Sequence, residues 1–212
     1  MSSSDPNVVP RLVLASGSPR RRELLGKLGL QFEVIVSDLD ESIASTDPAF
    51  IVKDLASAKA LAVAESIKGA ADNGSSKSLV LGADTIVVLD DDILGKPQDR
   101  AEAVQMLTKL SGRLHQVFTG VSLVELPSGK VSTIYTVTDV HFREIDAREI
   151  EAYVDTGEPM DKAGAYALQG IASLFVCKID GCYTNVIGLP IPDTVQLLRQ
   201  HGLEVMGMGA KA

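Results

Sequence analysis

The chain has 212 residues, 45% of them hydrophobic and 23% charged, and a formal net charge of -8 at pH 7. This length and composition predict a folded protein with a full hydrophobic core. The negative charge argues against sequence-independent binding to DNA, RNA or an anionic membrane, and no apolar stretch reaches membrane-spanning length. We therefore expect no nucleic-acid polymer and no membrane among the partners.

The first residues and the cysteines both indicate a cytoplasmic protein. The opening stretch, MSSSDPNVVP, lacks the basic segment and apolar run of a secretory signal peptide. We expect a flexible tail over residues 1–10 and a single domain over residues 11–212. Cys177 and Cys182 flank an expected turn at Asp180-Gly181. Two thiols alone cannot complete a zinc site, so free thiols in a reducing compartment are the favoured interpretation.

Strand and helix signals alternate along the chain, which predicts an α/β fold with a mixed sheet. Apolar runs predict strands, which we expect at residues 11–16, 32–37 and 78–89, in a hairpin around 126–129 and in a second hairpin at 175–188. Caps and glycine stops predict helices, which we expect at residues 18–29, 47–67, 99–112, from 146 onward and at 190–202. Asp99 with Glu102 has the spacing of a capping box, as has Asp146 with Glu149. Residues 68–77 are expected to form a surface loop.

Three consecutive arginines follow Pro19 in the first turn of the expected helix at 18–29. That end of a helix carries partial positive charge, so each exposed cation there is disfavoured by about 0.3 to 1 kcal/mol. A polyphosphate would explain the cluster, because the SGS turn offers backbone N–H groups and arginine adds bidentate donors. The residues that we expect to bind the phosphates are Ser16, Ser18, Arg20 and Arg21. Pairing with carboxylates of a neighbouring loop explains the cluster equally well on helix placement alone.

Asp84 places a carboxylate inside the apolar run SLVLGADTIVVL, where its burial is costly. The small residues before it let a ligand approach the backbone closely. Asp84 is therefore a candidate general base or metal ligand, with a structural aspartate bonded to loop amides as the alternative. Carboxylates also crowd the DLDE stretch at 38–41. They predict either oxygen ligands for a cation such as Mg²⁺ or a solvated acidic turn.

Three lysines lie next to small residues rather than on a generally charged face. They are Lys59, Lys96 and Lys162. Each alone is typical of a surface lysine, but together with the arginines they would neutralise the roughly four negative charges of a nucleoside triphosphate. The histidines, His115, His141 and His201, show no paired spacing and are expected to be structural.

A different enzyme class competes for the acidic stretches. VIVSDLDES resembles the D-x-D strand end of haloacid-dehalogenase-type phosphatases, and IVVLDDD resembles their later acidic pair. Asp38 would then be the covalent nucleophile and Asp40 the acid. This interpretation gives the SGSPRRR turn and residues 159–170 no role.

Several stretches together resemble the Maf family of nucleoside triphosphate pyrophosphatases, in order from about Arg11 to Leu203. They are LASGSPRRRELL, SDLDES, AKALAVA, GADTIVV, LGKP, EPMDKAGAYALQG and NVIGLP. The resemblance implies a mixed, twisted sheet flanked by helices, with a cleft between two lobes. It also implies hydrolysis between the α and β phosphates, a divalent cation (Mg²⁺ or Mn²⁺) and a homodimer.

The resemblance also implies roles for particular residues. Asp84 matches the family's proposed proton acceptor, and Arg20, Thr85 and Gln169 match positions held to set base preference. The DKAGAYALQG form, which contains Lys162, resembles the branch that prefers dTTP and UTP. For the metal we expect Glu41 and Asp84 as carboxylate ligands. A non-catalytic nucleotide-binding module linked to cell division is the remaining alternative.

Overall fold

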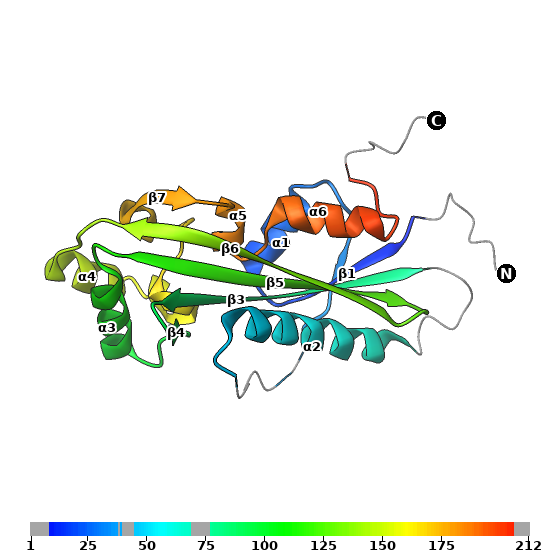
Figure 1. Ribbon diagram of the computed structural model, residues 1–212, viewed down its shortest axis with the longest axis horizontal. Helices are drawn as coiled ribbons and strands as arrows, with labels where there is room; N and C mark the ends of the chain where they lie inside the picture. Colours follow the sequence, from blue (N-terminus) through cyan, green and yellow to red (C-terminus); the bar gives the residue numbers. More distant parts are fainter. Residues whose placement is uncertain (1–8, 38, 40–44, 69–76, 206–212) are drawn as a thin grey trace.

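The protein is built around a twisted, mixed seven-stranded sheet (Figure 1). The computed structural model describes residues 9–37, 39, 45–68 and 77–205. The strand order is β2-β1-β3-β5-β6-β7, with β4 beside β3. The strands are β1 (Arg11–Ala15), β2 (Glu33–Val34), β3 (Ser78–Leu89), β4 (Asp92–Leu94), β5 (Leu114–Leu126), β6 (Lys130–Phe142) and β7 (Val176–Asp180). β1 is parallel to β2 and β3, and the other pairings are antiparallel.

Helices cover both faces of the sheet (Figure 1). They are α1 (Pro19–Gly26), α2 (Pro48–Lys68), α3 (Arg100–Leu110), α4 (Ala147–Val154), α5 (Tyr183–Ile187) and α6 (Ile191–Gln200). Three 3-10 turns, η1 (Glu158–Asp161), η2 (Ala163–Ala165) and η3 (Ile171–Leu174), follow α4. Side chains alternate along β1: Leu12 and Leu14 pack with α1 and α6, whereas Val13 and Ala15 pack against α2. Both faces of β1 are therefore buried, as is usual for a parallel pair.

A separate hydrophobic cluster lies at the other end of the long strands. There Val87, Val117 and Phe142 pack with residues of α3 and α4, such as Leu107 and Ile150. β3 runs from the hydrophobic residues that pack around β1 to this second cluster, and its 12 residues span about 40 Å. The middle of β3, which contains Asp84, thus lies between two packed ends of the molecule.

Most of the predicted elements are confirmed. These are the strands at 11–16 and 78–89, the hairpin around 126–129 and the helices at 18–29, 47–67, 99–112, from 146 and at 190–202. The capping box of Asp146 with Glu149 is complete. That of Asp99 with Glu102 is half formed, because the Glu102 carboxylate accepts from the Gln98 N–H instead. The expected tail and the loop at 68–77 lie almost entirely outside the described residues.

Two predicted strands differ in the structure. The strand at 32–37 shrinks to Glu33–Val34, because it is a sheet edge and Val36 is 64% exposed. The hairpin at 175–188 is wrong: β7 pairs with β6, and the residues after it coil into α5. That coil buries Asn185, whose Nδ2 donates to the Val117 carbonyl at 2.9 Å and to Thr138 Oγ1 at 3.0 Å.

Two further expectations concern the thiols and membrane-spanning segments. Cys177 and Cys182 are both free thiols, as expected. Among the described helices, none combines the length and the apolar character needed to cross a bilayer.

Helix α2 lies unusually close to the sheet because glycines face it. A Cβ on Gly82 would be 2.3 Å from the carbonyl oxygen of Ala56, and one on Gly120 would be 2.1 Å from the carbonyl oxygen of Val52. No side chain fits at these separations. The two glycines therefore set the distance between α2 and the middle of β3 and β5.

We expect Gly120→Ala to destabilise the protein by at least about 3 kcal/mol, because the helix backbone must move to admit one methyl group. Urea unfolding measures the change. Gly26→Ala is the matched control, since open space surrounds Gly26 and the same methyl group should leave stability nearly unchanged. Equal stability of Gly120→Ala and the wild type would contradict the close packing.

His115 is buried in the cluster formed by α3, α4 and the far ends of the strands. It is 1% exposed, and its Nε2 lies 2.9 Å from the Tyr166 hydroxyl. Burial lowers the pKa of this imidazole from 6.5 to about 4. His115 is therefore neutral in the folded protein at every pH above about 4.

This lowered pKa predicts that stability falls with acidity between pH 6.5 and about 4. In that window the unfolded chain binds a proton at His115 and the folded protein does not, which costs up to about 1.4 kcal/mol per pH unit. We expect the free energy of unfolding in urea to fall less between pH 7.5 and pH 4.5 for His115→Gln than for the wild type. Identical losses in the two proteins would contradict the lowered pKa of His115.

Candidate active site

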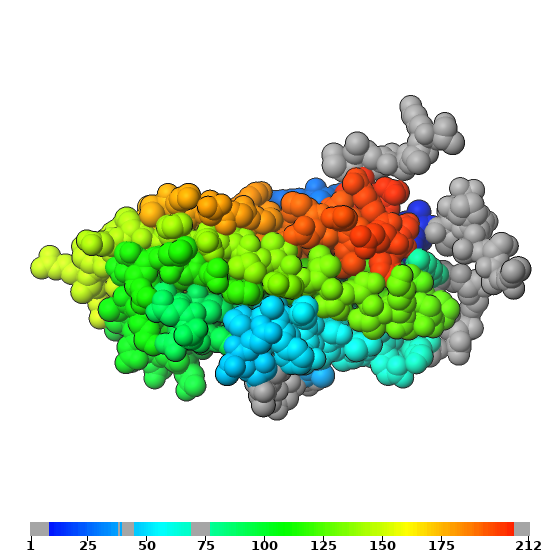
Figure 2. Space-filling model, in the orientation of Figure 1, coloured from blue at the N-terminus to red at the C-terminus, as the bar shows by residue number. Residues whose placement is uncertain are grey.

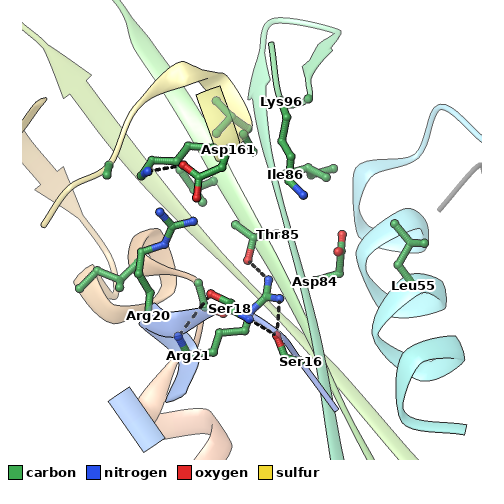
Figure 3. A pocket seen from close by; sticks show the side chains of 18 of the residues that line it. Ser16, Ser18, Arg20, Arg21, Leu55, Asp84, Thr85, Ile86, Lys96 and Asp161 are labelled. Atoms are coloured by element: carbon green, nitrogen blue, oxygen red, sulfur yellow. Dashed lines mark hydrogen bonds and ion pairs between the residues drawn. The ribbon is translucent and has the colours of Figure 1, made fainter. Parts of the chain in front are cut away.

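A cavity of about 660 Å³ opens between the N-terminus of α1, the middle of β3 and the η1–η2 segment (Figure 3). Its volume is in the range of small-molecule sites. All ten described candidate residues line it: Ser16, Ser18, Arg20, Arg21, Lys59, Asp84, Thr85, Lys96, Lys162 and Gln169. Glu41 lies outside the described residues.

The cavity exists because one edge of β3 is left uncovered. β1 pairs with Ser78–Gly82, and β4 pairs with Val87–Leu89. The described strands thus leave Ala83–Ile86 without a partner on that side. Both faces of β3 open there, so that Asp84 and Thr85, which alternate to opposite faces, line the same cavity.

The N-terminus of α1 forms one wall. Ser18 is the N-cap, with its hydroxyl 3.5 Å from the Arg21 N–H, and Pro19 occupies the first turn. No acidic residue lies in that turn. Ser16 Oγ accepts from the Ser18 N–H at 3.3 Å. The helix end therefore presents positive charge and small polar side chains to the cavity.

Three neutral oxygens are among the partners that hold Arg21 in place. Its Nε donates to the Gly188 carbonyl at 2.9 Å, its Nη1 to Ser16 Oγ at 3.3 Å and its Nη2 to Thr85 Oγ1 at 3.0 Å. The resemblance grouped Arg20 with Thr85, but it is Arg21 that contacts Thr85. Arg20 instead points toward the η1 side of the cavity (Figure 3).

Asp84 forms a buried ion pair with Lys59 of α2. Lys59 Nζ lies 2.7 Å from Asp84 Oδ1, and the two side chains are 11% and 9% exposed. Asp84 faces α2 for the same reason that Gly82 does, because alternate strand residues share a face. The lysine offsets the cost of burying the carboxylate, a role that the structural alternative for Asp84 assigned to loop amides.

The η1–η2 segment supplies the opposite wall. Lys162 Nζ donates to the Glu158 carbonyl at 2.8 Å and pairs with Asp161, whose side chain is 73% exposed. The Lys162 ammonium and, more weakly, the Arg20 guanidinium hold the pKa of the Asp161 carboxyl below its ordinary value. Gln169 is exposed at the cavity.

Two features of the site escaped the sequence analysis. Asp161 lines the cavity, and Gly188 supplies a carbonyl to Arg21. Both fall in motifs already singled out, EPMDKAGAY and NVIGLP, so position within those motifs was the available signal. Their contacts depend on chain segments that meet only in the fold.

The donor set of the cavity fits a cation that arrives with phosphates. In the described part of the chain, no three histidine, cysteine, aspartate or glutamate side chains converge on a metal position. Asp84 and Asp161 are the described carboxylates on the cavity. Mg²⁺ is commonly bound by one or two carboxylates together with substrate phosphates and water, so these oxygens suit it.

The acidic stretches give little support to the phosphatase alternative. Asp38 and Asp40 lie outside the described residues. In the later stretch, Asp90 pairs with Arg113 and Asp92 pairs with Lys109, all at exposed positions outside the cavity.

The fold is α/β, and its cavity gathers cationic side chains beside the N-terminus of a helix. Residues 11–201 match the family described as Maf-like protein, and the chain belongs to the Maf family. A relative from Desulforamulus reducens is 50% identical, covering 92% of this chain and 98% of its own. One from Moorella thermoacetica is 50% identical, covering 93% and 98%, and one from Hahella chejuensis is 47% identical, covering 92% and 94%. Each of the three is named dTTP/UTP pyrophosphatase.

The ion pair at the centre of the site predicts a stability effect. We expect Lys59→Met to cost about 3 kcal/mol in urea unfolding, because it leaves the Asp84 carboxylate buried without this partner. The double variant Lys59→Met/Asp84→Leu should recover most of the loss, since no unpaired charge is left. Additive losses in the double variant would show that the pair is not coupled.

Proposed function

We propose that this protein hydrolyses dTTP and UTP to the nucleoside monophosphate and pyrophosphate, and that it acts on modified pyrimidine nucleotides in the same way. The observation that carries the proposal is the convergence of the candidate cations and Asp84 on one cavity. The relatives named dTTP/UTP pyrophosphatase cover more than nine tenths of the chain and support the same reaction.

In the proposed mechanism the triphosphate lies against the Ser16–Arg21 turn. The N–H groups of the turn, with Ser16, Ser18, Arg20 and Arg21, take up the charge that grows on the leaving pyrophosphate, and Lys59, Lys96 and Lys162 add to this field. Arg20, Thr85 and Gln169 contribute to the choice of base. Electrostatic positioning supplies most of the acceleration, because transfer of this kind needs little covalent help.

Asp84 orients the attacking water and removes its proton. Lys59 holds one oxygen of the Asp84 carboxylate at 2.7 Å, and Asp84 lines the cavity. We propose that Asp84 and Glu41 hold the divalent cation, Mg²⁺ or Mn²⁺. When bound, the cation neutralises phosphate oxygens and promotes attack on phosphorus.

We also propose the surroundings in which the enzyme works. Residues 11–212 act as one domain, and the protein works in the cytoplasm, where its free thiols stay reduced and its nucleotide substrates occur. A homodimer is proposed from the family resemblance. Nucleic-acid polymers are not proposed as partners, because the net charge of -8 repels them.

Product analysis with UTP, dTTP, CTP and GTP in the presence of Mg²⁺ or Mn²⁺ tests the proposed reaction. We expect pyrophosphate and the monophosphate, with UTP and dTTP preferred. Asp84→Asn should lower kcat by at least about a hundredfold, because it removes the base, while the melting temperature stays near that of the wild type. Release of orthophosphate would instead indicate the aspartyl phosphatase, and binding without turnover would indicate the nucleotide-binding module.

A further inference from the structure

Behind Thr85 lies a buried hydroxyl that the proposed function does not use. Thr119 of β5 pairs with Thr85 across the sheet, is 0% exposed and does not line the cavity. Its Oγ1 is 3.0 Å from Thr85 Oγ1 and 3.0 Å from the carbonyl oxygen of Asn185. A hydroxyl has one proton and a carbonyl only accepts, so the Thr119 proton goes to Asn185.

This assignment fixes the direction of the remaining hydrogen bonds. Because Thr119 donates to Asn185, Thr85 must donate its own proton to Thr119. Thr85 Oγ1 then accepts from Arg21 Nη2 at 3.0 Å. The chain of donors therefore runs from Arg21 through both hydroxyls to the Asn185 carbonyl. The Thr85 hydroxyl then has one lone pair left and no proton to offer a ligand in the cavity.

A second contact to Arg21 starts from the same carbonyl. The Gly188 N–H donates to the Asn185 oxygen at 2.9 Å, and the Gly188 carbonyl accepts from Arg21 Nε at 2.9 Å. Gly188 has φ 118°, a conformation that favours glycine, and a Cβ there would lie 3.5 Å from Thr85 Oγ1. Two of the described contacts of Arg21, those with Gly188 and Thr85, thus trace back to Asn185 (Figure 3 shows the contact with Thr85).

We propose that Thr119 is a positioning residue for the pyrophosphatase reaction. It holds the Thr85 hydroxyl as an acceptor and so keeps the Arg21 guanidinium aimed at the phosphates of the substrate. The inference rests on the proposed function, because it assigns Arg21 to the substrate. Thr119 itself is buried and touches no ligand in this scheme.

The variants Thr119→Val and Thr119→Ser distinguish the role of the Thr119 hydroxyl from the role of the side chain's volume. Valine keeps the volume and removes the hydrogen bonds, so the KM for UTP should rise about three- to tenfold, with a smaller change in kcat. Serine keeps the hydroxyl and should restore the wild-type KM. A merely structural role would reduce the amount of folded enzyme, which lowers the apparent kcat and leaves KM unchanged.

A second background tests whether Thr119 acts through Thr85. In Thr85→Val, where the acceptor for Arg21 is already lost, adding Thr119→Val should change KM less than twofold. Ser122→Ala is the matched control. It removes another fully buried hydroxyl of β5, bonded to Thr133 at 2.8 Å and outside the cavity, and should leave KM unchanged.

The possible results distinguish this inference from the function on which it rests. If the wild type releases pyrophosphate from UTP and Thr119→Val keeps the wild-type KM, the inference is overturned. It is also overturned if Thr119→Ser does not have the wild-type KM. The same holds if Thr119→Val changes KM equally in the wild type and in the Thr85→Val protein. If the wild type releases no pyrophosphate from UTP, the proposed function itself is contradicted.

Discussion

The site depends on an interruption in the hydrogen bonding along one edge of β3. Between the end of β1 and the start of β4, residues Ala83–Ile86 have no described strand on that side. The two ends of β3 are anchored in separate hydrophobic clusters, which hold the uncovered segment in place. Catalytic groups on rigid strands keep their geometry better than groups on loops. The gap therefore supplies both the space for a ligand and a fixed frame for Asp84 and Thr85.

Around this gap, positive charge is concentrated in an otherwise acidic molecule. The chain carries a net charge of -8, yet the N-terminus of α1 has arginines in its first turn and no acidic residue there. Polar oxygens from three segments orient Arg21, and a buried carboxylate pairs with Lys59. The arrangement costs stability at the helix end, where cations are disfavoured, and a polyanionic ligand would recover it. Proteins commonly accept such local conflicts at functional sites.

Much of this could be predicted from the sequence, because the signals were local. Ser18-Pro19 marks the start of α1, and the apolar run around Asp84 marks a central strand. Local patterns and the family resemblance together predicted ten described residues that the fold brings to one cavity. Pattern alone could not show that Lys59 pairs with Asp84, nor that Arg21 rather than Arg20 reaches Thr85. These contacts join residues 25 and 64 positions apart, and they depend on how closely α2 and α1 pack on the sheet. The stretch at 183–187 was misread because the burial of Asn185 outweighs its strand-like composition.

The position of the bound nucleotide tests the account most directly. A crystal structure of the Asp84→Asn protein with UTP and Mg²⁺ measures it, since this variant should bind the nucleotide without consuming it. The account predicts the β and γ phosphates on the Ser16–Arg21 turn, with the α phosphate facing residue 84 across the space of one water molecule. Phosphates bound away from both the turn and residue 84 would contradict it.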